Sequence, residues 1–465
     1  MASNGIVRRL LVLCLLFVMV VSVAACGKDT QTNPTKGPGQ TETTDPTQGT
    51  DATNGNNPAT KTPQSGNATS APATKTPQSG GATVAPTLTE NEKPDVIEAD
   101  NKYANVKVYD KFGKWPLKSG KEYYSSEVGT WFTIWWMNKG EVTYDFHWFQ
   151  ECRLKPVDYG YYASNNVDYL TSVFARLKYI GIDFLLLDDT NGHWNDAGLL
   201  SRNMTAILRV ASKEGAYAPK IAIATGAPLR EGNTAQQQKE YDQYGKFYER
   251  FKSAFYLYEG KPLLVNYIAG EANARYSDNQ NRFTTRYGTG LVSWQKRASN
   301  QSIFKTQGNW GWVFDMQNAG SEVMGVQPGY NKPGMQSAVV KREGGKHYIE
   351  QWLAAIKANP KVIMIPSYND HCEETGWEAT TPVKKADAGL DQVPSGEDPY
   401  LYEKITEAYM ALRYGYIDGF FYQVENTTQV YQCKNGGLKK VDASAAGKEP
   451  IILLPKGYIE WEKNR

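Results

Sequence analysis

Short apolar runs alternate with helical patterns from Val128 to Tyr414, and this alternation limits the possible fold more than any other feature of the chain. The clearest run, Ile182–Asp188, is almost wholly apolar, as is typical of a parallel strand buried on both faces. It follows Asn166–Ile180, where apolar residues recur at helical spacing. Strands that alternate with helices over a long unbroken segment predict a parallel sheet covered by helices.

The expected strands number about eight, which favours a (β/α)8 TIM barrel in a single α/β domain. A doubly wound sheet fits less well, because no glycine-rich phosphate loop follows an early strand. The region Gly270–Ser302 has no clear pattern. The other expected strands are Val128–Met137, Lys220–Thr225, Pro262–Tyr267, Trp310–Met316, Val323–Gln327 and Val362–Pro366, with Phe420–Val424 as a closing strand. Further helices are expected around Tyr241–Phe251, Tyr348–Ala358 and Tyr402–Tyr414.

The N-terminus has the pattern of an export signal. An apolar run follows Arg8 and Arg9 and ends at Cys26. Its last four residues, Val-Ala-Ala-Cys, resemble the lipobox of bacterial lipoproteins, which implies a signal peptide at residues 1–26 and lipidation of Cys26. An ordinary secretory signal and a transmembrane anchor are the alternatives, although the run is short for a membrane span.

A polar, repetitive segment separates this signal from the expected domain. Residues 27–95 are rich in Thr, Pro, Gly and Asn, and the unit Ala59–Gly66 recurs as Ala73–Gly80. A segment with so few large apolar residues cannot offset the entropy of ordering, so we expect a disordered linker. The expected arrangement is a domain over residues 96–465, anchored by lipid to the extracellular face of the cell membrane.

Charge and cysteine content exclude several classes of function. The net charge is +2 over 465 residues, which gives no electrostatic reason to expect a nucleic-acid partner. We expect a monomer that contacts the membrane only through its lipid anchor. Beyond the N-terminal segment the cysteines are Cys152, Cys372 and Cys433, an odd number. There is no CxxC or HExxH motif and the chain has 4 His, so neither a metal nor a cofactor is expected.

Three acids crowd into the segment after the expected strand Val362–Pro366. They are Asp370, Glu373 and Glu374. Bringing carboxylates together is costly because like charges raise each other's pKa. The carboxyl end of a strand is also where α/β barrels carry their chemistry. Paired carboxylates there suit acid/base work on an uncharged substrate, and sugars are the first candidate.

Polar and aromatic residues follow the other expected strands as well. Asp188 and Asp189 end one of them, and we expect both to hydrogen-bond the substrate. An Asp after a strand is often only a helix cap, and an aromatic residue is often only core. The chain has 12 Trp and 30 Tyr, which suits a groove that stacks on sugar rings. The residues expected to wall the sugar subsites are Trp136, His193, Trp194, Tyr267 and Trp377.

The acid cluster also resembles known signatures. Ser367–Glu373, which reads Ser-Tyr-Asn-Asp-His-Cys-Glu, resembles the Trp-Asn-Asp-x-Gly-Glu signature of glycoside hydrolase family 71 and the Asn-Glu-x-x-Glu signature of family 99. Gly181–Asp188 and Trp131–Trp136 are similar to strands of these families. They hold α-1,3-glucanases and endo-acting α-mannanases or α-mannosidases on (β/α)8 barrels. Cys372 departs from the family 71 glycine, and Asp370 departs from the family 99 glutamate.

The resemblance implies a general acid/base role for Glu373. Asp370 would be the second carboxylate, which activates water or deprotonates a neighbouring sugar hydroxyl; inversion and retention both stay open. The expected function is therefore hydrolysis of a polysaccharide or glycan, an α-linked glucan or mannan, by a carboxylate acid/base mechanism. A non-catalytic, cell-surface carbohydrate-binding lipoprotein of the same fold is the main alternative. A structural or adhesive surface protein without a sugar site is another.

Overall fold

A computed structural model describes eight segments of the chain, all within one compact unit that extends from Leu88 to Arg465. The segments are residues 122–192, 198–230, 232–268, 276–290, 302–312, 322–331, 340–383 and 397–463. The expected signal peptide, with Cys26, and the expected linker lie outside the described residues. No helix in the described segments has the length and apolar character needed to span a membrane.

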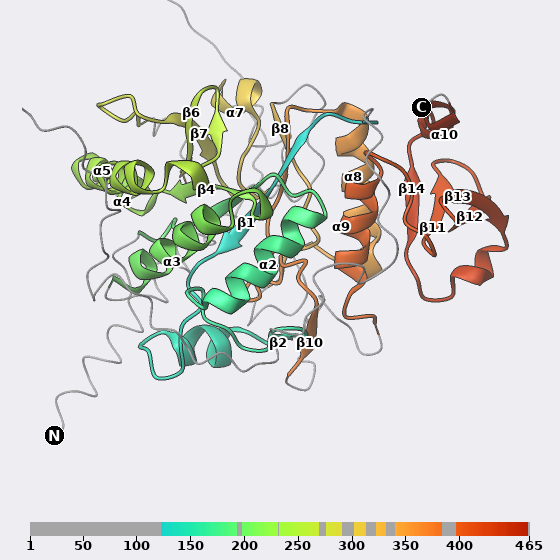
Figure 1. The fold of residues 1–465 in the computed structure, drawn as a ribbon, viewed down its shortest axis with the longest axis horizontal. Helices are drawn as coiled ribbons and strands as arrows, with labels where there is room; N and C mark the ends of the chain where they lie inside the picture. Colours follow the sequence, from blue (N-terminus) through green and yellow to red (C-terminus); the bar gives the residue numbers. More distant parts are fainter. Residues whose placement is uncertain are drawn as a thin grey trace, which may run out of the picture. The chain divides into compact units, whose positions relative to one another are not determined.

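Among the described residues, eight strands form the large sheet, and all but β5 run parallel (Figure 1). Their order is β5-β6-β4-β3-β1-β9-β8, and β7 also pairs with β6. The strands are β1 (Glu127–Thr133), β3 (Phe184–Asp188), β4 (Lys220–Thr225), β5 (Leu257–Tyr258), β6 (Lys261–Tyr267), β7 (Thr284–Gly288), β8 (Val323–Gly325) and β9 (Val362–Ile365). The first strand, β1, pairs with both β3 and β9, so the two ends of the strand series lie side by side. Early and late strands meet in this way in a barrel.

Alternate residues of these strands pack on the inner face of the sheet, since side chains on a strand point to opposite faces in turn. Gly129 makes room there, because a Cβ at this position would lie 2.4 Å from the Phe184 ring. The inner cluster consists of Trp131, Phe184, Leu186, Ala222, Ala224, Tyr256, Tyr258, Leu263, Val265, Trp310, Trp312, Val323, Val362 and Met364. The sheet is therefore curled around a filled interior, although no ladder joins β7 to β8 in the described residues.

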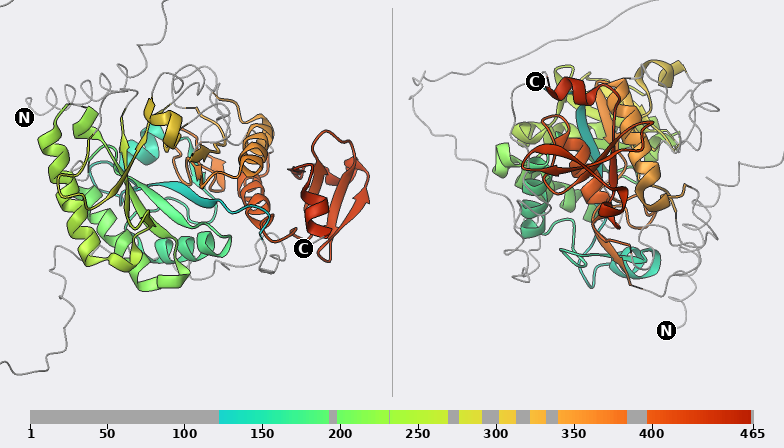
Figure 2. Two further views of the ribbon diagram at one scale, coloured as in Figure 1. Left: turned by 90° about the horizontal axis from the view of Figure 1, so that it is seen from above. Right: turned by 90° about the vertical axis from the view of Figure 1, so that its right-hand side faces the viewer.

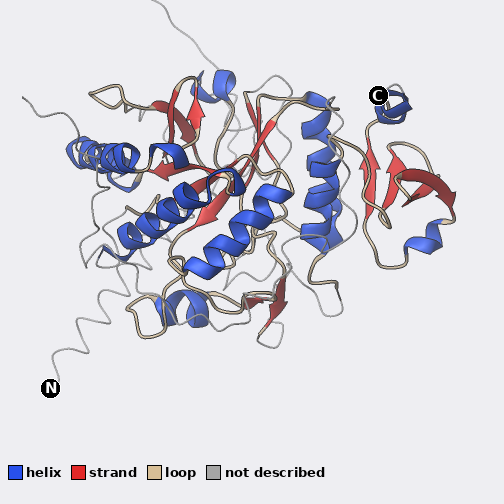
Figure 3. Ribbon diagram, viewed as in Figure 1, coloured by secondary structure: helices blue, strands red, loops and turns tan. Residues whose placement is uncertain are grey.

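Helices pack on the outer face of the sheet (Figure 3). The long ones are α2 (Val167–Tyr179), α3 (Leu199–Glu214), α5 (Thr234–Arg250), α8 (Lys346–Ala358) and α9 (Leu401–Ala411). In α2, the side chain of Asn166 caps the first turn by accepting a hydrogen bond from the Tyr169 N–H. Leu170, Phe174 and Leu177 form the buried stripe of the same helix.

Shorter elements complete the large unit. A π-helical turn, η3 (Asp145–Glu151), precedes a two-stranded ladder of β2 (Leu154–Pro156) and β10 (Thr380–Pro382). The remaining short helices are η5 (Gly215–Tyr217), α4 (Ala227–Arg230), η6 (Lys252–Ala254), α7 (Ser302–Gln307) and η8 (Glu343–Gly345).

The last part of the chain forms a second sheet, with the order β13-β12-β11-β14. Its elements are β11 (Phe421–Val424), β12 (Val430–Lys434), β13 (Gly437–Val441), η9 (Ala443–Ala446), β14 (Ile451–Leu454) and α10 (Tyr458–Lys463). Figure 2 shows α8 and α9 between this sheet and the large one. The hydroxyl of Tyr409 on α9 donates to the carbonyl of Leu453 on β14 at 3.1 Å.

The structure confirms a mixed α/β fold with a parallel sheet and corrects one expectation. Phe420–Val424 does not close the large sheet, because its strand β11 pairs with β12 and β14 instead. The place beside β1 is already taken by β9. The region Gly270–Ser302, which has no clear pattern in sequence, contains β7. Part of the expected strand Trp310–Met316 lies outside the described residues.

Candidate active site

Polar residues gather where parallel strands end. Asp188 and Tyr267 are the last residues of β3 and β6, and Tyr330 and Asp370 each come five residues after the ends of β8 and β9. Because these strands are parallel, their carboxyl ends lie at one edge of the sheet. This edge is where a barrel enzyme binds its substrate.

The loop after β9 is anchored firmly to the end of β1. The amide oxygen of Asn369 accepts from the Thr133 N–H at 2.8 Å, and the Thr133 hydroxyl donates to the Asn369 carbonyl at 3.1 Å. The Tyr368 N–H donates to the Trp131 carbonyl at 2.8 Å. These bonds fix the backbone immediately before Asp370.

Asp370 lies at the centre of the turn and is only 2% exposed. Its Oδ1 accepts from the backbone N–H groups of Cys372 at 3.1 Å and Glu373 at 3.0 Å. Burial raises the pKa of Asp370 well above its ordinary value, and the charges of Glu373, Asp188 and Glu151 act in the same direction. Asp370 is thus a carboxyl group whose proton is held unusually tightly.

Glu373 is more accessible than Asp370. Its Oε1 accepts from the hydroxyl of Tyr330 at 3.3 Å, and its carbonyl accepts from the Asn331 N–H at 3.0 Å. Burial and the charges of Glu373 and Asp370 raise the pKa of Tyr330, so this tyrosine stays protonated and donates. The segment after β8 therefore supports the second carboxylate of the turn.

Glu374, the third acid, is directed elsewhere. It is buried and forms an ion pair with Arg153, and its Oε2 accepts from the Asn331 side chain at 3.0 Å. Its φ of +47° lies in the left-handed region, which is strained for a residue with a Cβ. Arg342 holds the strained turn by donating to the carbonyls of Glu374 at 2.6 Å and Gly376 at 2.7 Å. Glu374 thus stabilises the loop.

The two aspartates after β3 have different surroundings. Asp188 accepts from the Thr190 N–H at 3.1 Å and is close enough to Asp370 to raise its pKa. Asp189 accepts from the hydroxyl of Tyr244 on α5 at 2.7 Å, behind the sheet. Burial raises the pKa of Asp189 well above its usual range. Asp188 therefore borders the acid turn, whereas the environment of Asp189 favours a structural role.

The expected aromatic walls lie in different environments. Trp136 is fully buried and stacks on Trp148 with ring centroids 3.8 Å apart. Trp377 is buried too, and its indole N–H donates to the Thr130 hydroxyl at 3.2 Å. Tyr267 is partly exposed and packs edge-on against Trp312. His193 and Trp194 lie outside the described residues.

His371 is a buried support for the turn. Its Nε2 lies 2.9 Å from Oε2 of Glu378, which also accepts from the Tyr162 hydroxyl at 2.9 Å. Burial raises the pKa of Glu378, and the contact with His371 acts against that rise. This arrangement makes His371 part of the packed wall behind Asp370.

Sequence reasoning missed several residues of this site. Tyr330 could have been found, because it follows a strand end just as Asp370 does. His147 and Glu151, four apart on η3, together with Cys372 form a group that could hold a metal ion. The only signal of this group in the sequence is the i, i+4 spacing of the histidine and the glutamate.

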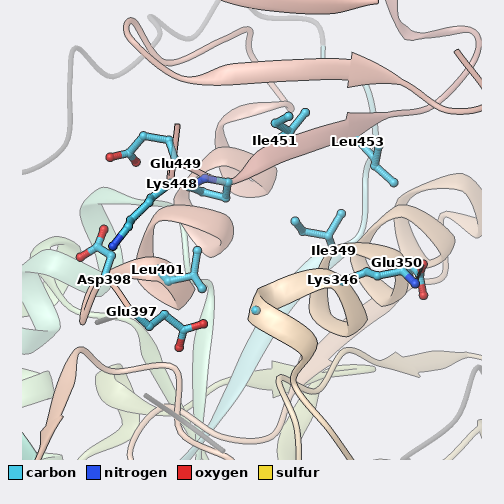
Figure 4. Close-up of a pocket in the computed structure, with 12 residues that line it drawn as sticks. Lys346, Ile349, Glu350, Glu397, Asp398, Leu401, Lys448, Glu449, Ile451 and Leu453 are labelled. Atoms are coloured by element: carbon cyan, nitrogen blue, oxygen red, sulfur yellow. Dashed lines mark ion pairs between the residues drawn. The ribbon is translucent and has the colours of Figure 1, made fainter. Parts of the chain in front are cut away.

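A pocket of about 550 Å³ lies elsewhere, between the starts of α8 and α9 and the strand β14 (Figure 4). None of the expected site residues lines it. Two of its acids, Asp398 and Glu449, are paired with Lys404 at 2.6 and 2.7 Å. The pocket is thus a hollow beside the second sheet and not part of the acid site.

No family model and no curated protein matches this sequence. Two solved structures of the GH99 endo-alpha-mannosidase from Bacteroides thetaiotaomicron, one with bis-tris propane, are similar at 19% and 18% identity, each with a TM-score of 0.43. Each match covers 61% of this chain and 96% of the solved chain. At these values, the activity of this chain has to be inferred from its own side chains.

Proposed function

We propose that the protein is a glycoside hydrolase that uses Asp370 and Glu373 as its two carboxylates. The observation that carries the proposal is that both carboxylates lie in one turn at the carboxyl end of β9. In this turn, Asp370 Oδ1 accepts a hydrogen bond from the Glu373 N–H at 3.0 Å. The charge of each opposes ionisation of the other, which favours one protonated and one ionised carboxyl. Glycoside hydrolysis needs that combination.

In this proposal, Glu373 is the general acid/base. It is the more accessible of the two, and the Tyr330 hydroxyl orients its carboxyl group. The raised pKa of Asp370 puts the proton of the pair on Asp370 in the free protein, so in this proposal that proton passes to Glu373 when the substrate binds, which leaves Asp370 ionised. Glu373 then gives the proton to the glycosidic oxygen as the bond to the leaving sugar breaks. Asp370 takes a proton either from the attacking water or from a neighbouring sugar hydroxyl. Asp188, with its carboxylate beside the turn, is a substrate hydrogen-bonder.

We also infer that the large sheet closes as a (β/α)8 barrel, with residues 309–312 in the place of its sixth strand. Two contacts support this. The Trp310 N–H donates to the Tyr287 carbonyl of β7 at 3.2 Å, and the Trp131 indole donates to the Trp310 carbonyl at 2.8 Å. The segment 309–312 therefore lies beside β7 and faces the same interior as β1.

The proposed substrate is an uncharged α-linked glucan or mannan. The formal net charge of +2 gives no attraction toward a strongly anionic polymer. Partly exposed rings near the acid turn, Tyr267 and Tyr330, suit contacts with sugar faces and hydroxyl groups.

The Val-Ala-Ala-Cys run supports a further proposal, that Cys26 carries a lipid at the outer face of the cell membrane. Cys26→Ser should then move the protein from the membrane fraction to the soluble fraction.

The test is sugar release by the full-length chain. The protein is incubated with α-glucans and α-mannans, and new reducing ends are measured. Asp370→Asn and Glu373→Gln should each lower turnover by roughly 10²–10⁴-fold, the usual contribution of acid/base catalysis. Asp145→Asn, an exposed change on η3, is the matched control. If both variants keep full activity, the assignment of the carboxylates is wrong.

A second candidate is a carbohydrate-binding protein of the same fold that does not catalyse hydrolysis. The burial of Asp370 favours it, because a carboxyl group that is 2% exposed and bonded to two backbone N–H groups is hard for a substrate to reach. Calorimetry distinguishes the candidates. Binding of a glucan or mannan oligosaccharide without release of reducing ends would support the binding protein.

A further inference from the structure

A histidine, a glutamate and a cysteine meet next to the acid turn. One ligand atom from each of His147, Glu151 and Cys372 lies within 4.8 Å of the others. His147 Nδ1 is 3.4 Å from Glu151 Oε2. The mechanism proposed above uses none of these three side chains, so the cluster calls for a separate explanation.

Two parts of the chain that are distant in sequence build the cluster. His147 and Glu151 are four residues apart on the π-helical turn η3, a form of helix that often occurs at functional sites. Cys372 is on the loop after β9, and its backbone N–H is bonded to Asp370. The sulfur of Cys372 is directed toward η3 and lies 3.9 Å from the His147 carbonyl. The fold thus brings the three side chains together.

The ligand atoms are available for binding. In the described part of the structure, His147 Nδ1 is buried and has no hydrogen-bond partner. The imidazole is held by stacking on Trp135, with centroids 5.7 Å apart. Cys372 is a free thiol, 8% exposed. The Glu151 side chain is 25% exposed, which leaves a path from solvent to the cluster.

We propose that His147, Glu151 and Cys372 bind Zn²⁺ and leave its fourth coordination position open. Nitrogen, carboxylate oxygen and thiolate sulfur are the donors that zinc takes in proteins, at about 2.0–2.3 Å. In a tetrahedral site these bond lengths put ligand atoms roughly 3.3–3.8 Å apart, so the observed cluster has to contract only slightly. Ca²⁺ and Mg²⁺ prefer sets made of oxygen alone.

Binding is a simple exchange of a proton for a metal. The Cys372 sulfur forms a bond to Zn²⁺ and releases its proton to solvent, while Glu151 and neutral His147 bind without further chemistry. The site does not depend on the proposed hydrolase activity, because the metal itself can be measured.

The test uses full-length protein stripped with a chelator and then dialysed against Zn²⁺ or Co²⁺. Elemental analysis measures zinc, and absorption measures charge transfer from thiolate to cobalt. The wild type should hold one more zinc than Cys372→Ser, and the charge-transfer band should be lost in that variant. His147→Phe, which preserves stacking on Trp135, and Glu151→Gln should each weaken binding by more than the roughly 10–100-fold seen for loss of an outer partner.

Controls make the result specific. Cys433→Ser removes a buried thiol in the second sheet and should leave zinc content and the cobalt band unchanged. Circular dichroism checks that every variant is folded. Equal zinc content in the wild type and in all three folded ligand variants would overturn the proposal. Displacement of the zinc by a moderate excess of Ca²⁺ would overturn it as well.

Discussion

Asp370 and Glu373 are three positions apart, yet their environments differ. Asp370 is buried and bonded to backbone N–H groups, whereas Glu373 is partly exposed and bonded to a tyrosine hydroxyl. The spacing in the sequence pointed to both. The structural role of Glu374, which pairs with Arg153, could not be predicted from the neighbouring residues, because its partner is 221 residues away in the sequence.

Tyr330→Phe tests the support of Glu373. The change removes the hydroxyl that lies 3.3 Å from Glu373 Oε1 and keeps the ring. A hydrogen bond to a charged group contributes about 1.5–3 kcal/mol, so kcat/KM should fall roughly tenfold or more. Steady-state kinetics on the substrate identified by the screen measures this. Unchanged kinetics in Tyr330→Phe would show that Glu373 does not need the tyrosine.

Arg153→Met tests the ion pair beneath the turn. The substitution leaves Glu374 buried without its cationic partner, and breaking such a pair costs about 3–5 kcal/mol. Urea unfolding should therefore show a large loss of stability. Lys346→Met is the control, because its contacts with Glu343 and Glu350 are exposed and contribute about 1 kcal/mol or less. Equal losses in both variants would contradict this account.

Asp278 carries a prediction about pH. Burial alone would raise its pKa, but the hydrogen bonds from Arg282, Gln238 and the backbone outweigh burial and hold the pKa well below its usual range. A depressed pKa in the folded state contributes stability above the unfolded value of about 3.9, and this contribution is lost as the pH falls below it. Asp278→Asn should therefore destabilise the protein at neutral pH.

The same variant should differ less and less from the wild type as the pH falls below about 4. Urea unfolding of both proteins at neutral and acidic pH measures the difference. A difference in the free energy of unfolding that stays constant over this range would mean that Asp278 is not stabilised by its charge.

Individual strands were predictable where their residues are apolar. β4 has the bounds expected from its sequence, and β3 and β9 fall within the expected runs. β7 was missed because it reads Thr-Thr-Arg-Tyr-Gly, without an apolar pattern. Its Arg286 is paired with Glu322 at 2.8 Å and Glu259 at 2.9 Å, contacts that depend on the assembled fold. Polar strands of this kind have no signal in a single sequence.

Gly129→Ala tests the contact between β1 and β3. A Cβ at this position would lie 2.4 Å from the Phe184 ring, which is itself stacked on Tyr256. Overpacking of this kind costs about 1–3 kcal/mol. Gly457→Ala meets nothing within 4 Å and is the matched control. Urea unfolding should separate the two variants, and equal midpoints would mean that the interior is not packed as described.

The sequence predicted the fold class of the whole domain, but it did not predict the second sheet at the C-terminal end of the chain. Alternating strands and helices indicated the parallel sheet, whereas the neighbour of β1 was predicted wrongly: β9 lies there, and not Phe420–Val424. The second sheet was not foreseen, because its strand β11 looks in sequence like one more strand of the large sheet. Which sheet a short strand joins is decided by partners such as β12 and β14.

The central claim is that Glu373 donates a proton to the leaving sugar. A poor leaving group needs that proton, whereas an aryl group with a low pKa leaves without it. The most direct measurement therefore compares kcat/KM of wild type and Glu373→Gln on a glycan and on an activated aryl α-glycoside of the same sugar. We predict a loss of roughly 10²–10⁴-fold on the glycan and little loss on the aryl glycoside. An equal loss on both substrates would contradict the acid role of Glu373.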